Sequence, residues 1–186
     1  MNLEEMRLDC AIKQKRGLHI IMASVIIWTA VMIVHLTSLD SITKNLLTFC
    51  CTAPLLPISL MISKLIKVDF QNKGNPLTNL GILFSVNQIL YLLIAMWIYS
   101  AVPSKMVMVL AMIFGAHLMP YSWLYKSRVY FVLSIVIPIM ALIVGLFFAP
   151  YILALVMIIV EVMFCILLCI ENRGLSNEYL DRGEKS

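Results

Sequence analysis

Glu161 is the residue whose type and position point most directly to chemistry in this sequence. It is a carboxylic acid inside a long apolar run that ends near Ile170, with no Lys or Arg at the same depth. An ionised carboxylate is costly inside a bilayer, and acids placed there usually face the bundle interior and mark a pathway or a partner. Without a nearby cation, this carboxyl is expected to keep its proton at neutral pH and to donate a hydrogen bond.

Other polar side chains fall in the same layer as Glu161. A rise of 1.5 Å per residue places Glu161 about 15 Å deep, His117 about 12 Å deep and Asn87 roughly 13–16 Å deep. Gln88 and Tyr91 extend the contribution of the Asn87 helix, about one turn apart on its surface. The sequence therefore predicts a polar layer near the middle of the membrane.

This layer has two interpretations. In the functional one, Glu161, His117 and Asn87 converge on the path of a solute, an ion or a proton. In the structural one, they hydrogen-bond across helices and hold the bundle together, as polar side chains in membranes often do. Glu161 favours the functional interpretation because an amide can join helices more cheaply than a carboxylate can. Asn87 and Gln88 favour the structural one.

Metal, enzyme and nucleic-acid chemistry lack their usual sequence signals. Glu161, Cys165 and Cys169 share one helix face at a spacing of four residues, but compact pairs such as H-x-x-x-H or C-x-x-C are missing. Hydrolase and phosphate-loop motifs are also missing. The basic residues form no stripe interleaved with aromatic residues, as a nucleic-acid face needs. We expect no metal, no cofactor, no nucleic-acid partner and no enzymatic activity.

The composition identifies the elements that must position the polar layer. The chain has 186 residues, of which 62% are hydrophobic and 13% charged. A soluble domain is nearer half apolar and a quarter charged. We therefore expect an integral membrane protein, all-α, whose helices cross the lipid bilayer.

Six apolar runs are long enough to cross a hydrocarbon core about 30 Å thick, which takes about 20 residues. They are Leu18–Leu36, Asn45–Ile66, Leu77–Tyr99, Lys105–Tyr125, Val129–Phe147 and Pro150–Ile170. The sequence thus predicts one bundle of six transmembrane helices. With an even number of crossings, both termini lie on the same side of the membrane.

The basic residues orient this bundle, because Lys and Arg accumulate in short cytoplasmic loops. With both termini in the cytoplasm, 12 of the 14 basic residues lie inside and only Lys44 and Lys105 lie outside. The 12 are Arg7, Lys13, Lys15, Arg16, Lys64, Lys67, Lys73, Lys126, Arg128, Arg173, Arg182 and Lys185. Both termini are therefore predicted to be cytoplasmic.

The chain is expected to divide into a cytoplasmic tail over residues 1–17, the membrane domain over 18–170 and a second cytoplasmic tail over 171–186. Asn2 and Glu5 have the spacing of a helix capping box, which indicates a short helix on the membrane surface. A solvated basic leader that only sets the topology is the alternative.

Prolines and small residues mark special positions in the runs. Pro54 and Pro57 interrupt the second run and Pro138 the fifth, so the central helix of each half contains proline. Interrupted helices at matching positions are typical of transporters built from inverted repeats, although proline is common in membrane helices. Ala111 and Gly115 lie four residues apart and predict close approach of a neighbouring helix.

Three segments carry a resemblance to a known family. They are Asn45–Cys51 (NLLTFCC), Ser63–Phe70 (SKLIKVDF) and Gly115–Tyr125 (GAHLMPYSWLY). Together they resemble a family of small bacterial six-span membrane proteins of unknown function. The resemblance implies a bacterial plasma membrane, and it brings no activity, cofactor or site.

The preferred functional hypothesis is binding or transport of a small solute or ion, linked to a proton, through Glu161, His117 and Asn87, with Gln88 and Tyr91 beside them. The alternative is a non-catalytic accessory, structural or immunity-type membrane protein in which the layer only joins helices.

Overall fold

The structure is a computed structural model that describes residues 2–69 and 72–183, and over these residues it is helical without a strand. The all-α prediction is confirmed. The α-helices are α1 (Leu3–Lys13), α2 (Leu18–Leu36), α3 (Ser41–Thr52), α4 (Leu55–Leu65), α5 (Leu77–Ala101), α6 (Met106–His117), α7 (Met119–Leu124), α8 (Arg128–Phe147) and α9 (Pro150–Gly183), with short 3₁₀ turns η1 (Lys15–Gly17) and η2 (Pro103–Lys105).

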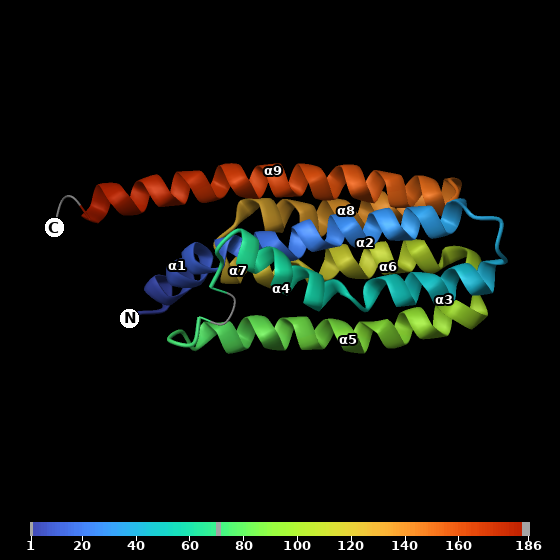
Figure 1. Ribbon diagram of the computed structural model, residues 1–186, viewed down its shortest axis with the longest axis horizontal. Helices are drawn as coiled ribbons and strands as arrows, with labels where there is room; N and C mark the ends of the chain where they lie inside the picture. Colours follow the sequence, from blue (N-terminus) through green and yellow to red (C-terminus); the bar gives the residue numbers. More distant parts are fainter. Residues whose placement is uncertain (1, 70–71, 184–186) are drawn as a thin grey trace.

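Six helical segments are long and apolar enough to cross a membrane, which confirms the predicted number. They are Lys15–Leu36, Ser41–Leu65, Leu77–Ala101, Pro103–Leu124, Arg128–Phe147 and Pro150–Leu175. They run side by side along the long axis of the molecule, and both termini lie at the same end (Figure 1). We call this the termini end and the other the opposite end.

Two of the six segments are broken, and both breaks involve proline. The second is interrupted at Ala53 and Pro54, between α3 and α4, and the fourth at Leu118, two residues before Pro120. In contrast, α8 runs through Pro138 without a break. Proline in the central helix of each half therefore has different effects, since the second span is broken at Pro54 and α8 is unbroken at Pro138.

The two closest helix contacts are those of α2 with α9 and of α6 with α8, and we call these four helices the packed half. At the contact of α6 with α8, a Cβ added to Gly115 would lie only 2.6 Å from Cδ of Pro138 and 2.7 Å from Cγ2 of Ile137. A Cβ added to Gly145 would similarly collide with Met108. Gly115 thus confirms the predicted close approach, because only a missing side chain leaves room for the facing helix.

The other side of the bundle, formed by α3, α4 and α5, is the open half. Among the described side chains of α5, only Thr78 and Ala95 are buried by protein. The outward side chains of α5 are mainly apolar and include Ile82, Leu83, Val86, Leu90, Leu93, Ile94, Met96 and Trp97. Such a surface suits lipid, whose tails are as apolar as leucine.

Both predicted tails contain helix within the described residues. Asn2 caps α1, and Glu5 returns the bond to the Asn2 backbone, so the expected capping box is present. α9 continues past Ile170 to Gly183, so residue 171 is not a helix boundary. Of the predicted tail over 171–186, residues 184–186 lie outside the described residues.

Candidate functional site

Glu161 lies on α9 and is fully buried, with an exposed fraction of 0%. Its Oε2 is 2.5 Å from the hydroxyl Oγ of Ser24 on α2. Its Oε1 has no hydrogen-bond partner within residues 2–69 and 72–183. The acid that the sequence singled out is therefore enclosed between two helices of the packed half, where an unpaired charge is costly.

The hydrogen bonds of Ser24 can be counted, because a serine hydroxyl carries a single hydrogen. Its Oγ lies 2.7 Å from the carbonyl oxygen of Ile21 as well as 2.5 Å from Oε2 of Glu161. A carbonyl oxygen only accepts, so the bond to Ile21 uses the serine hydrogen. A protonated Glu161 can supply the hydrogen of the second bond, whereas an ionised one leaves one of the two bonds without a hydrogen.

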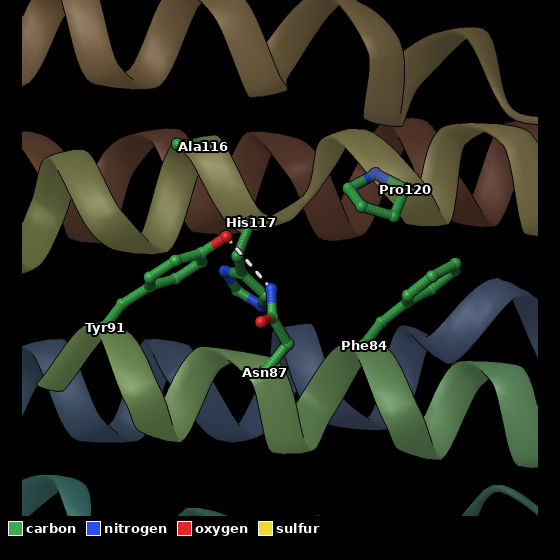
Figure 2. A pocket seen from close by; sticks show the side chains of 6 residues that line it. All are labelled: Phe84, Asn87, Tyr91, Ala116, His117 and Pro120. Atoms are coloured by element: carbon green, nitrogen blue, oxygen red, sulfur yellow. Dashed lines mark hydrogen bonds between the residues drawn. The ribbon is translucent and has the colours of Figure 1, made fainter.

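Asn87, Tyr91 and His117 come together elsewhere, in a pocket between α5 and the α6–α7 segment. The pocket has a volume of about 130 Å³, and its six lining residues are Phe84, Asn87, Tyr91, Ala116, His117 and Pro120. Nδ2 of Asn87 donates a hydrogen bond of 2.9 Å to the hydroxyl of Tyr91. Figure 2 shows Asn87 and Tyr91 extending from α5 toward His117 on the facing helix.

The contacts of His117 define which ring nitrogen carries its hydrogen. Nδ1 lies within hydrogen-bond distance of the carbonyl oxygen of Phe114, one turn earlier on α6. Because that oxygen can only accept, Nδ1 must be the donor, and Nε2 of the neutral ring is left as an acceptor. The rings of Phe114 and Tyr121 pack edge-on against the imidazole and hold its orientation.

The residues of the predicted layer therefore occupy two places. Asn87, Tyr91 and His117 line one pocket, and Glu161 is not among its lining residues. Gln88 is half-buried on α5 and does not line the pocket either. Helix rise gives the depth along the membrane but not which helices are neighbours, and α5 and α9 lie at opposite sides of the bundle (Figure 1).

Sequence reasoning missed the partner of Glu161, which is Ser24. A serine in an apolar helix is common and carries no signal by itself, because its hydroxyl often bonds to the backbone one turn earlier. His19 was missed as well: it lies five residues before Ser24 on α2 and is 2% exposed.

A polar network at the termini end was also missed. Arg16 is 3% exposed and adopts a left-handed φ of 51°, which is uncommon for a residue other than glycine. Its guanidinium donates to the carbonyl of Tyr125 at 3.2 Å and to Oδ1 of Asn172 at 3.2 Å, and its Nε lies 3.6 Å from Glu171. This network joins the start of the first span to the end of the last one.

Asp9 forms a second network in the same region, between α1 and the turn before α5. Its carboxylate pairs with Lys13 at 2.7 Å and accepts a bond of 2.9 Å from each of Asn72 and Asn75. Burial alone would raise the pKa of Asp9, but the hydrogen bonds from Lys13, Asn72 and Asn75 outweigh it and hold that pKa below its usual range. The carboxylate thus ties α1 to the bundle.

The described residues contain no cluster of metal-binding side chains. No three His, Cys, Asp or Glu side chains in them come close enough to hold a metal ion. The arrangement therefore offers two polar places, one enclosed around Glu161 and one lined pocket around His117.

Six membrane-length helices, a buried acid and a polar-lined pocket define this chain as a small multi-pass helical membrane protein. Residues 3–171 match the family of unknown function DUF7010, and the chain belongs to that family. The match agrees with the resemblance in the sequence to a family without an assigned activity. A search of curated proteins and a search of solved structures gave no match.

Proposed function

We propose that this protein is a non-catalytic multi-pass protein of the bacterial plasma membrane that binds and moves a small solute or ion, linked to a proton on Glu161. The observation that carries the proposal is the complete burial of Glu161, whose Oε1 lacks a hydrogen-bond partner in the described part of the chain. A carboxyl whose proton can be taken and returned is what a proton-linked carrier needs.

The hydrogen count at Ser24 supports a neutral Glu161 as the resting state. Neutral Glu161 can donate to Ser24 while Ser24 donates to Ile21, so both short contacts are satisfied. Release of the proton would leave a buried charge beside a single hydroxyl, which is unfavourable unless the helices separate or water enters. Loss of the proton would therefore favour a different packing of α2 against α9.

The solute is placed in the pocket of Asn87, Tyr91 and His117, since it is the polar hollow between α5 and α6. α5 is the span with the least protein cover among the described side chains. A weakly held helix can shift relative to the packed half at low cost, which is what coupled movement of a solute requires.

The orientation belongs to the proposal too. The two basic residues at the opposite end, Lys44 and Lys105, donate to the carbonyls of His35 and Gly145 near the C-terminal ends of α2 and α8. Cations are stabilised there by the helix dipole, so these two lysines have a local reason to lie at that end. The remaining basic residues favour a cytoplasmic location of the termini end.

The test is infrared difference spectroscopy of the wild type and Glu161→Gln in lipid. Gln keeps a neutral side chain that can still donate to Ser24, so folding should be preserved. We expect a protonated carboxylic C=O band near neutral pH that disappears in the variant and that bleaches reversibly on alkaline titration. A spectrum with only carboxylate bands would contradict the proposal.

The accessory or structural alternative has its own supporting observation. Ser24 and Glu161 join α2 to α9, which are the two helices with the most extensive mutual packing. If the pair only joins helices, Glu161→Gln should retain any cellular phenotype of the protein while Glu161→Ala lowers its amount. If the proposal holds, Glu161→Gln loses the phenotype at a normal protein level.

A further inference from the structure

The pocket around His117 has the size of a single ring. Its volume is about 130 Å³. An engineered apolar cavity of about 150 Å³ in another protein holds one benzene molecule. The walls of Phe84, Ala116 and Pro120 are apolar, and Phe84 and Tyr91 provide ring faces and edges (Figure 2). A ligand of one ring, or of five to six carbon atoms, therefore fills it.

The polar groups in this pocket present both a donor and acceptors. The Tyr91 hydroxyl accepts from Asn87, so its own hydrogen remains available to donate. Nε2 of His117 accepts, because Nδ1 donates to Phe114. Oδ1 of Asn87 is a second acceptor. A hydroxyl group matches this set, because it donates one hydrogen and accepts another.

The charge of the lining excludes ions as the preferred ligand. None of the six lining residues is Asp, Glu, Lys or Arg. An ammonium group would find no carboxylate to pair with, and a carboxylate or phosphate would find no fixed cation. At a depth of about 12 Å from the membrane surface, counted from the helix rise, an unpaired ion would lose most of its favourable hydration. The ligand is therefore neutral.

The pocket also opens away from the bundle axis. Asn87, Tyr91 and Ala116 are among its lining residues and are partly exposed, Tyr91 by 38%. A ligand can thus enter from the lipid between α5 and α6, which suits a molecule that already partitions into membranes.

We propose that this pocket binds a small, neutral, membrane-soluble alcohol or phenol, whose hydroxyl bonds to His117 and Tyr91 while its carbon ring or chain packs against Phe84 and Pro120. The proposal rests on the proposed function in taking the pocket as the solute site, and it names the class of that solute.

The test measures binding of 4-fluorophenol and 4-fluorotoluene by ¹⁹F NMR, with the protein in lipid nanodiscs and empty nanodiscs as the blank for partitioning. The two probes have nearly the same shape and differ in the hydroxyl. We expect saturable binding of the phenol, about five- to tenfold tighter than that of the toluene, as one or two neutral hydrogen bonds would give.

Three variants locate the site. Ala116→Leu fills the pocket and should abolish saturable binding, and Tyr91→Phe, which removes one of the two partners of the ligand hydroxyl, should weaken binding of the phenol but not of the toluene. Ala101→Leu makes the same substitution at the end of α5, away from the lining, and should bind like the wild type.

Equal affinity for the two probes, binding no greater than in empty nanodiscs, or unchanged binding in Ala116→Leu would each overturn the proposal. If Ala116→Leu does not fold, Tyr91→Phe on the more open helix decides, because unchanged binding of the phenol in this variant would also overturn the proposal. The outcome is separate from that at Glu161: a missing C=O band would leave phenol binding intact, and failed phenol binding would leave the band intact.

Discussion

The helices of the packed half and those of the open half associate in different ways. In the packed half, α6 and α8 meet at Gly115 and Gly145, where backbones approach so closely that a Cβ has no room. In the open half, α5 contributes only Thr78 and Ala95 as buried residues among its described side chains. Close packing therefore concentrates on one side of a bundle whose six spans have similar apolar compositions.

This difference shows why burial of a polar group has a different meaning in each half. Glu161 lies where helices cannot easily move apart, so its protonation state is tied to the packing of α2 against α9. His117 lies at the border with the open half, where a ligand can enter without separating closely packed backbones. Our proposals therefore assign different tasks to the two polar places, a proton to one and a neutral molecule to the other.

The largest expected effect is in the α6–α8 contact. Gly115→Ala should lower the free energy of unfolding by at least about 3 kcal/mol, because the new methyl group must displace both Pro138 and Ile137. Equilibrium unfolding in mixed micelles measures it. Gly174→Ala is the matched control: no heavy atom lies within 4 Å of its added Cβ, so it should be neutral or stabilising. Equal effects of both changes would show that the α6–α8 contact does not require a glycine at position 115.

The number and type of the elements could be predicted from the sequence, because a membrane crossing needs about 20 apolar residues and a helix to satisfy its backbone. The acid at Glu161 and the small residue at Gly115 could be found for the same reason: each departs from an otherwise apolar or bulky run. The lateral arrangement of the helices could not be predicted. It depends on side-chain packing between spans, and it separates Glu161 on α9 from the pocket of Asn87 and His117 beside α5.

Contacts across long sequence separations were equally hidden. Arg16 donates a hydrogen bond to Asn172, 156 positions further along the chain. In the sequence, each of the two residues is an ordinary member of a polar tail. The left-handed backbone at Arg16 gives no signal in the sequence either, since it departs from the usual preference of that residue type. In this left-handed turn before α2, only Gly17, with a φ of 69°, is of a residue type that favours such backbone.

The next largest effect is expected at the termini end, which joins both halves. Arg16→Ala should cost about 2–3 kcal/mol, because it removes charged hydrogen bonds to Tyr125 and Asn172 in a buried place. Arg16→Lys should recover part of this loss, since it keeps the charge but not the forked geometry. Thermal unfolding in nanodiscs compares them with Arg128→Ala, whose side chain is exposed. An effect of Arg16→Ala no larger than that control would show that this network does not stabilise the bundle.

A smaller, local effect is expected for the attachment of α1 through Asp9. Its pKa is lowered in the folded state, so the stabilisation is complete above the unfolded value of about 4. It is lost as the pH falls through the folded value. Cys10, which is buried beside it, reports this attachment. With the other four cysteines replaced by alanine, Cys10 should react with a dithiodipyridine severalfold faster at pH 3 than at pH 7, relative to a free thiol.

Asp9→Asn provides the matched control for this titration. Because Asn cannot ionise, its Cys10 should be reactive at pH 7 and should show little further change at pH 3. Protection of Cys10 in the wild type that is the same at both pH values would show that the carboxylate of Asp9 does not hold α1.

The smallest effect is expected on the outer face of α5. Leu83 is 60% exposed, and lipid tails replace its contacts when it is truncated, so Leu83→Ala should change the free energy of unfolding by less than about 0.5 kcal/mol. Leu153→Ala is the matched change in the packed half, where the side chain is 1% exposed, and it should cost about 2–4 kcal/mol through the cavity that it leaves. The same unfolding measurement in nanodiscs compares the two. A cost at Leu83 close to that at Leu153 would mean that protein, not lipid, covers α5 in the membrane. The open half would then be a contact surface, and entry of a ligand between α5 and α6 would require that contact to open.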